Sequence, residues 1–399
     1  MDRTIENGVP PLIAHPSRGA ILGEIHARPF APLATPQRLL HFAFMTDQSQ
    51  AAADREALAR FCAERGVPGP AEGAKHHRTR LGETSLRWEQ HSEFTTYTWE
   101  LPSPGSVPFL PATTILPHGM HALPQPGPHL VAVDLHLLQE KAIPDLETLF
   151  DPASLAASLV DGEAGVAATD FRAGADGFVR ILVLDRALTP AKAGALAQRL
   201  LEVETYRVLA LLGLPEAHRL APSVRRTEEV LVRIAGTMMQ TDGLAADNAL
   251  LDEMTAIAAT MESEAASSNY RFGASRAYDS IVGQRLEAIG EAPYGGWPTI
   301  AAFLSRRMAP AMRTCQMLQQ RQLDLSRRLA RAANLLRTRV DVALEQQNRD
   351  LLSAMNDRTR LQLRLQQTVE GLSVAASGYY VVRPFGYLAK GAKDDGSLP

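Results

Sequence analysis

Short apolar runs in the first half of the chain predict β-strands. They lie at residues 38–46, 84–101, 129–138 and 177–186. These runs are rich in aromatic residues, β-branched residues and threonine, which favour a pleated sheet. A helix is predicted over 47–66, because Asp47 suits its first cap and Gly66 lies past its end. This order of elements predicts a small α+β domain over residues 21–187.

After residue 187 the apolar residues recur at helical spacing. Over residues 188–213 they form one face, with Thr189 as the predicted N-cap and Pro190 in the first turn. Further helices are predicted at about 215–240, 244–267 and 274–290. We therefore expect a helical region over residues 188–290, followed by a hinge of turn residues, EAPYGGWP, at 291–298.

One very long amphipathic helix is predicted over residues 299–370. No glycine lies between Trp297 and Gly371, and no proline lies between Pro310 and Pro384. About 60 helical residues would span roughly 90 Å. The apolar positions recur at three, four or seven: Leu318, Leu325, Leu329, Ala332, Leu336, Val340, Ala343, Leu361, Leu365, Thr368 and Leu372. Such a coiled-coil-like stripe packs against the preceding helices, a second subunit or both, so we expect a homo-oligomer through this helix.

The C-terminal residues 371–399 form a predicted membrane-proximal segment and tail. The stretch GLSVAASGYYVVRPFGYLA is largely apolar but contains a charge and a proline. Tyrosine is favoured at bilayer interfaces, and a lysine follows the stretch. The residues expected to lie at the lipid surface are Tyr379, Tyr380, Arg383, Tyr387 and Lys390. The alternative is an apolar helix end packed on its own protein or on a neighbouring subunit.

Composition narrows the classes of partner and compartment. The formal net charge of the 399 residues is −3, which does not favour nucleic acid as a partner. The two cysteines have no CxxC spacing, so neither a disulfide framework nor a cysteine zinc site is expected. Residues 1–20 read as a flexible tail without the apolar core of a signal peptide, which predicts folding in the cytoplasm.

The histidines gather in the first third of the chain, and HGMH contains two of them three residues apart. His118 and His121 are therefore candidate metal ligands. The motif lies in a proline-rich stretch, and a metal site needs three or four converging ligands, so exposed or core-satisfied histidines are the favoured interpretation. No cofactor is predicted, since the common phosphate-binding, dinucleotide, hydrolase and zinc-protease motifs are missing from the sequence.

The stretch EIHARPF near the N-terminus is the candidate for acid–base or anion chemistry. In an extended segment Glu24, His26 and Arg28 share one face, where the carboxylate would orient the imidazole and the guanidinium would hold an anion. The alternative, which we favour, is a structural polar network at a corner set by Pro29 and Pro32.

Several long stretches also carry a resemblance. They are EIHARPF with PQRLLHFAF, LRWEQHSEFTTYTW, DFRAGADGFVRILVLDRALTPAKAGALAQRLLEVETYR and LARAANLLRTRVDVALEQQNRDLLSAMNDRTRLQLRLQQTVEGLSVAASGYY. With them the chain resembles a family of bacterial membrane-anchored proteins of unknown function. The resemblance implies a cytoplasmic body carried by C-terminal helices at the inner membrane. Arg383-Pro384 and the end of the sequence at Pro399 depart from that pattern, so we expect either a shortened form or a natural variant without firm anchoring, partly soluble in both cases.

Three functions remain open on these grounds. The first is a non-enzymatic, oligomeric, membrane-associated protein with an α+β body on a helical stalk. The second is a divalent-cation channel or transporter, because the layout is similar to that of CorA-type channels, although their Gly-Met-Asn signature is missing. The third is an enzyme or anion-binding domain that uses EIHARPF.

Overall fold

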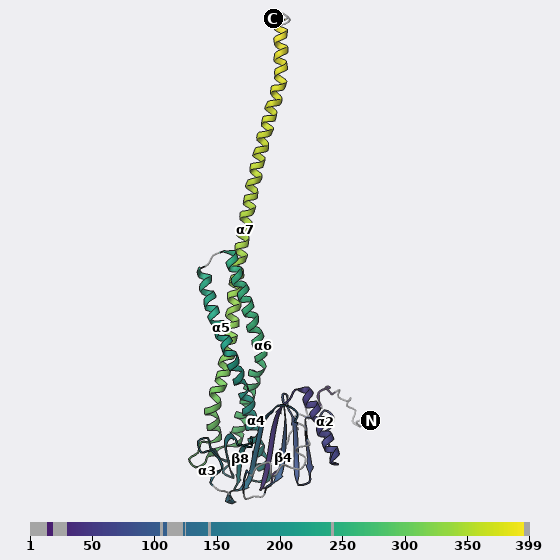
Figure 1. The fold of residues 1–399 in the computed structure, drawn as a ribbon, viewed down its shortest axis with the longest axis vertical. Helices are drawn as coiled ribbons and strands as arrows, with labels where there is room; N and C mark the ends of the chain where they lie inside the picture. The colour runs from purple at the N-terminus through teal and green to yellow at the C-terminus, as the bar shows by residue number, and fades with distance from the viewer. Residues whose placement is uncertain are drawn as a thin grey trace, which may run out of the picture. The chain divides into compact units, whose positions relative to one another are not determined.

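A computed structural model describes residues 14–18, 30–103, 107–109, 123, 125–142, 145–240 and 243–394, with side chains as far as 391. The chain divides into two compact units. Unit 1 comprises Met1–Pro222 and Ala266–Gln320, and unit 2 comprises Ser223–Ala265 and Arg321–Pro399. Three helices run from one unit into the other, and Figure 1 shows the elements of each.

Unit 1 is built on a mixed sheet, which in the described part of the chain has nine strands in the order β2-β3-β4-β1-β5-β8-β7-β6-β9. The strands are β1 (Gln37–Met45), β2 (His76–Leu81), β3 (Thr84–Gln90), β4 (Phe94–Pro102), β5 (His129–Gln139), β6 (Ala156–Val160), β7 (Gly165–Ala173), β8 (Val179–Asp185) and β9 (Ala292–Pro293). The β5–β8 pair is parallel and the other pairs are antiparallel.

The described helices have the following bounds, and α2 and α4 begin at the start signals read from the sequence. They are α2 (Gln48–Glu64), α3 (Leu146–Leu149), α4 (Pro190–Leu211), α5 (Gly213–Gln240), α6 (Leu244–Ile289) and α7 (Ile300–Asp394), with a 3-10 turn η3 (Glu140–Ala142). Asp47 caps α2 in a reciprocal capping box with Gln50, and the Thr189 hydroxyl accepts from the Lys192 N–H at the start of α4. The sheet followed by long helices confirms the predicted α+β class.

Helices cover both faces of the sheet in unit 1. On one face α4 packs with the unit-1 parts of α6 and α7 over Leu39, Leu135 and Ile181. On the other face α2 covers the β3–β4 half, where Phe61 meets Trp99 edge to face at a centroid distance of 6.4 Å. The short helix α3 covers the β7–β8 half of that same face.

Unit 2 consists of the remaining parts of α5, α6 and α7, packed along buried apolar positions such as Ile234, Met254 and Leu336. Ion pairs join the three helices: Arg321 with Glu228 at 2.6 Å, Arg339 with Asp247 at 3.3 Å, and Arg233 with Glu253. Arg321 and Arg339 of α7 therefore supply ion pairs to both neighbouring helices of this unit.

The long predicted helix is confirmed, and it is longer than its glycine-free and proline-free window. It has 95 residues and continues through Gly371 and Pro384. An exposed helix tolerates glycine at a cost of about 1 kcal/mol, and water can satisfy the carbonyl that loses its partner at proline. Residues 244–290 likewise form one helix, α6, where two were expected.

Candidate functional site

The residues that the sequence singled out lie mostly outside the described part of the chain. Glu24, His26 and Arg28 fall there, and so do His118 and His121. The segment just after EIHARPF is placed: the Leu33 N–H donates to Pro190 O at 2.9 Å. A Cβ on Gly194 would lie 1.9 Å from Ala31 O, so glycine permits this close crossing of α4.

A polar sheet face beneath α4 brings together groups that sequence reasoning did not select. Arg87 and Glu89 come from β3, Thr96 from β4 and His41 from β1. The intervening Trp88 points to the opposite face, where it packs with the apolar side of α2. Strand alternation therefore gives this half of the sheet one apolar face and one polar face, both buried.

The polar face borders a cavity of about 200 Å³, which we call the inner cavity. Its lining residues include His41, Arg87, Glu89, Thr96, Gln198, Glu202, Thr205 and Arg285. α4 supplies Gln198, Glu202 and Thr205, and the unit-1 part of α6 supplies Arg285. These eight side chains are polar, and His91, Phe94, Leu201 and Tyr206 complete the lining.

A chain of hydrogen bonds runs along one wall of the inner cavity. Arg87 Nη1 donates to Gln198 Oε1 at 3.1 Å, and Gln198 Nε2 donates to Glu202 Oε1 at 2.9 Å. Arg285 Nε completes the chain by donating to Glu202 Oε2. This network orients two guanidinium groups around the cavity.

Three polar atoms at the cavity are buried and have no hydrogen-bond partner among the described residues: Arg87 Nε, Glu89 Oε1 and Thr96 Oγ1. The Glu89 side chain is 9% exposed, and its other oxygen lies 3.7 Å from Arg87 Nε. Glu89 and Thr96 are directly opposite each other across β3 and β4. One free acceptor, one free donor and one hydroxyl therefore lie close together on a single face.

His41 closes the floor of the inner cavity as a neutral imidazole. Its Nδ1 lies 2.8 Å from Thr98 Oγ1 and its Nε2 lies 3.0 Å from Thr205 Oγ1. Thr205 Oγ1 donates to Leu201 O at 2.8 Å, so it accepts from His41 and the proton sits on Nε2. Burial, with a smaller contribution from Arg87, lowers the pKa of His41 to about 3. His41 therefore adds no positive charge to the cavity near neutral pH.

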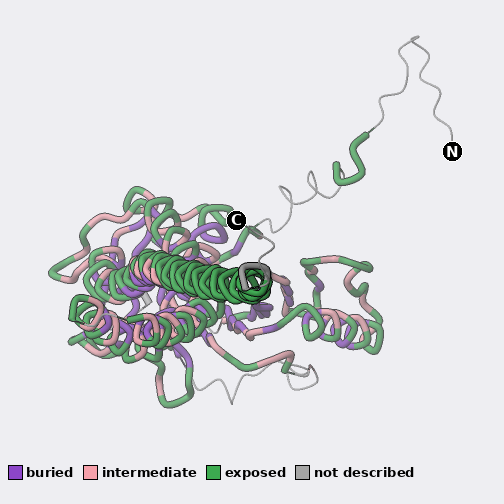
Figure 2. Tube along the Cα trace, turned by 90° about the horizontal axis from the view of Figure 1, so that it is seen from above, coloured by how far each residue is buried: buried purple, intermediate pink, exposed green. Residues whose placement is uncertain are grey.

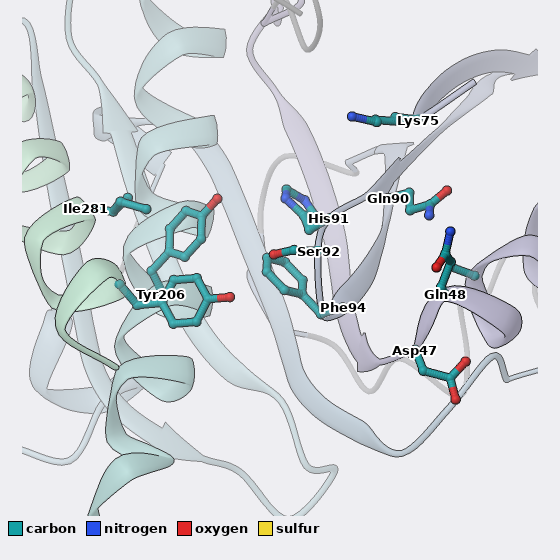
Figure 3. Close-up of a pocket in the computed structure, with 11 residues that line it drawn as sticks. Asp47, Gln48, Lys75, Gln90, His91, Ser92, Phe94, Tyr206 and Ile281 are labelled. Carbon is teal, nitrogen blue, oxygen red and sulfur yellow. The ribbon is translucent and has the colours of Figure 1, made fainter. Parts of the chain in front are cut away.

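A second and larger cavity, of about 550 Å³, adjoins the first, and we call it the outer cavity. His91, Phe94 and Tyr206 line both. Figure 3 shows Tyr206 and Ile281 on one side of it and His91, Ser92 and Phe94 on the other. The rings of His91 and Phe94 stack at a centroid distance of 4.0 Å, so the two cavities share an aromatic wall.

Beside the outer cavity, a buried carboxylate is clamped by α6. Arg271 donates to both oxygens of Glu93, at 3.1 and 2.6 Å, and the Tyr270 hydroxyl donates at 3.3 Å. Tyr278 also lines the cavity, and burial together with its hydrogen bond to Glu93 raises its pKa. Tyr278 therefore stays protonated near neutral pH and acts as a hydrogen-bonding wall.

The opposite sheet face contains a second buried polar cluster, on β1 and β5. Arg38 donates from Nε and Nη2 to the two oxygens of Asp134, at 2.9 and 2.8 Å. His136 Nε2 lies 3.3 Å from Asp134 Oδ1 and 3.3 Å from the Phe109 N–H. Burial acts to raise the pKa of Asp134, but hydrogen bonds from His136 and Arg38 outweigh it and hold the pKa low. The bidentate geometry and full burial give this cluster the features of a structural ion pair.

In unit 2, α7 presents a long uncovered surface. Every residue from Leu344 to Gly391 is exposed, and Figure 2 shows this part of the helix in green. Five of its exposed leucines share one face: Leu344, Leu351, Leu361, Leu365 and Leu372, which we call the α7 stripe. Tyr379, Tyr380, Arg383, Tyr387 and Lys390 lie further along the same exposed helix, and the Arg383 guanidinium lies 5.5 Å from the Tyr379 ring centre.

The described residues contain neither a cluster of metal ligands nor a membrane-spanning helix. Among them, no group of three or more histidine, cysteine, aspartate or glutamate side chains is arranged to hold a metal ion. None of the helices in this part of the chain is long and apolar enough to cross a membrane.

The fold and the cavities define an α+β protein with a polar internal site and a very long helix. A family model described as "Protein of unknown function (DUF3422)" matches residues 13–399, and the chain belongs to this family. The resemblance to an uncharacterised family is thus confirmed, while the description of the family assigns no membrane anchor. No curated protein and no solved structure matches the chain.

Sequence reasoning missed the inner cavity because its signal is ambiguous. Arg87, Glu89 and Thr96 alternate with Trp88 and Tyr97, as polar residues do on the wet face of a half-exposed strand. Only the packing of α4 shows that this polar face is buried.

Proposed function

We propose that this chain is a homo-oligomeric protein that assembles through α7 and contacts a membrane surface with the end of that helix. The observation that supports the proposal best is the α7 stripe. Its leucines are 43 to 66% exposed within a helix that no other described segment covers after Leu344. Apolar groups in such a row are stabilised only when another surface buries them.

The spacing of the stripe favours a second copy of the same helix as the occupant. Leu344, Leu351, Leu365 and Leu372 are separated by multiples of seven, with Arg358 at the position between Leu351 and Leu365, and Leu361 takes the intermediate position of the heptad. A seven-residue repeat keeps the apolar seam facing a partner helix along its whole length. A bilayer surface would place no such demand on period, so we assign this part of α7 to self-association.

The last turns of α7 have a different chemistry, and for them we propose a lipid surface. Tyr380, Phe385 and Leu388 are 74, 68 and 68% exposed, and Arg383 and Lys390 lie among them. Tyrosine and basic residues beside apolar ones are typical of segments that lie in the bilayer interface. The proposal is surface contact on the cytoplasmic side, supported by this composition.

Light scattering coupled to size-exclusion chromatography tests the assembly. We expect a discrete molar mass that is an integer multiple of 43.3 kDa. A mass of one chain at every concentration would contradict the proposal. The double substitution Leu365→Glu/Leu372→Glu is expected to reduce the measured molar mass to that of one chain, because a coiled-coil seam does not tolerate buried charge.

A further inference from the structure

The inner cavity has the properties of a ligand site, independent of assembly by α7. Its lining side chains include three buried atoms, Glu89 Oε1, Arg87 Nε and Thr96 Oγ1, none of which has a hydrogen-bond partner in the described part of unit 1. A buried polar atom without a partner costs roughly 1 to 3 kcal/mol, so native proteins seldom keep three of them together. A bound molecule with matching groups would remove that cost.

The charges around the cavity indicate the net charge of that molecule. Arg87 and Arg285 are balanced by Glu89 and Glu202, and His41 is neutral. At the buried Arg87–Glu89 pair, a ligand with a net charge would leave one charge uncompensated. The ligand should therefore be neutral overall while still offering a strong donor and a strong acceptor.

The positions of Arg87, Glu89 and Thr96 on the sheet indicate where the donor and the acceptor of the ligand lie. Arg87 and Glu89 are two residues apart on β3, so their side chains emerge side by side on one face. Thr96 lies opposite Glu89 on β4. A cationic donor beside Glu89 and Thr96, with an anionic acceptor next to it beside Arg87, satisfies all three atoms with charge-assisted hydrogen bonds.

We infer that the inner cavity binds a zwitterion of the α-amino-acid class. Its ammonium group lies against Glu89 and Thr96, and its carboxylate lies against Arg87. The volume of about 200 Å³ holds the head group, and the side chain passes His91, Phe94 and Tyr206 into the outer cavity of about 550 Å³. The width of the outer cavity makes room for a large side chain, including an aromatic one that contacts this wall.

Thermal-shift assays followed by calorimetry on the full chain test this site. The probes are the protein amino acids, each added singly at millimolar concentration. For every amino acid that binds, its N-acetyl derivative and its decarboxylated amine are the matched probes. We expect saturable binding by at least one amino acid, and loss of binding when either charged group of that molecule is removed.

Substitution of Glu89 locates the binding. Glu89→Gln keeps the shape and removes the charge that faces the ammonium, so the dissociation constant should rise by at least about tenfold. Glu140→Gln is the control, because Glu140 pairs with Arg186 away from the cavity and should leave affinity unchanged. If Glu89→Gln does not fold, Thr96→Val replaces it, with a weakening of several-fold expected.

Three results would overturn the inference. The first is no thermal shift with any amino acid. The second is equal binding of the N-acetyl derivative, since that molecule lacks the cation. The third is amino-acid binding that survives both Glu89→Gln and Thr96→Val, which would place the ligand elsewhere in the protein.

Discussion

At the residue scale, the buried polar groups of unit 1 are the positions where single atoms decide stability. His41 is held neutral between two threonine hydroxyls, and Asp54 on α2 accepts hydrogen bonds from Trp88 Nε1 at 2.7 Å and the Tyr97 hydroxyl at 2.5 Å. Each group is costly to bury and is retained because its partners are in place. Both therefore give measurable predictions.

The pKa of His41 predicts an acid sensitivity. The imidazole has a pKa of 6.5 when exposed and about 3 in the folded protein. Between these values the unfolded chain binds the proton and the folded chain does not, so stability falls as the pH falls from 6.5 towards 3. The stability advantage of the native protein over His41→Gln should shrink by about 1.4 kcal/mol per pH unit in that window, measured by urea unfolding. A difference that is constant with pH would contradict this assignment.

Truncation of Asp54 should cause a large loss of stability, because its carboxylate holds two buried donors. Asp54→Ala leaves the Trp88 and Tyr97 donors buried without a partner, which should lower the free energy of unfolding by about 2 to 4 kcal/mol. Tyr97→Phe removes only one of the two donors and should cost less. Denaturant unfolding of both variants checks the order, and an Asp54→Ala loss no greater than that of Tyr97→Phe would be inconsistent with it.

At the scale of elements, α7 contains two different stripes. As far as Val340 its buried positions are covered within the protein, whereas after Leu344 every described residue is exposed. The buried series ends at Leu336 and Val340, and the exposed stripe begins one turn later at Leu344.

This element predicts that thermal stability depends on protein concentration. If copies of α7 bury each other's stripe, association stabilises the helix by mass action, and its melting temperature should rise with concentration. Circular dichroism on the native protein and on Leu365→Glu/Leu372→Glu measures this. The dependence should vanish in the variant, and its persistence there would place the interface elsewhere.

Most of these elements were predictable from the sequence, and the exceptions have physical reasons. Asp47 and Thr189 marked helix starts through their capping chemistry, and Trp88 and Trp99 marked strands. The strand β2, with the polar sequence HHRTRL at the edge of the sheet, was missed because it lacks apolar alternation. The strands β6 and β7 were also missed, because their alanine-rich sequences have low strand propensity. The inner cavity was not predictable, since it depends on which sheet face α4 covers, a contact between residues far apart in the chain.

At the scale of the whole molecule, the end of α7 predicts binding to lipid. Tyr380→Ser/Phe385→Ser removes two exposed rings and should reduce co-sedimentation with vesicles of phosphatidylcholine and phosphatidylglycerol several-fold. Leu352→Ser/Leu363→Ser removes exposed apolar groups from an earlier part of the helix and should leave binding unchanged. Equal sedimentation of both variants and the native protein would contradict a role for the aromatic end.

Sedimentation of three proteins tests self-assembly through the α7 stripe most directly. They are the native chain, Leu365→Glu/Leu372→Glu on the stripe, and Leu363→Glu/Val374→Glu on the opposite side of the same helix. Self-assembly through the stripe predicts one oligomeric species for the native chain and for the opposite-side variant. It predicts single chains of 43.3 kDa for the stripe variant. A native chain that sediments as a monomer, or a stripe variant that keeps the native mass, would contradict it.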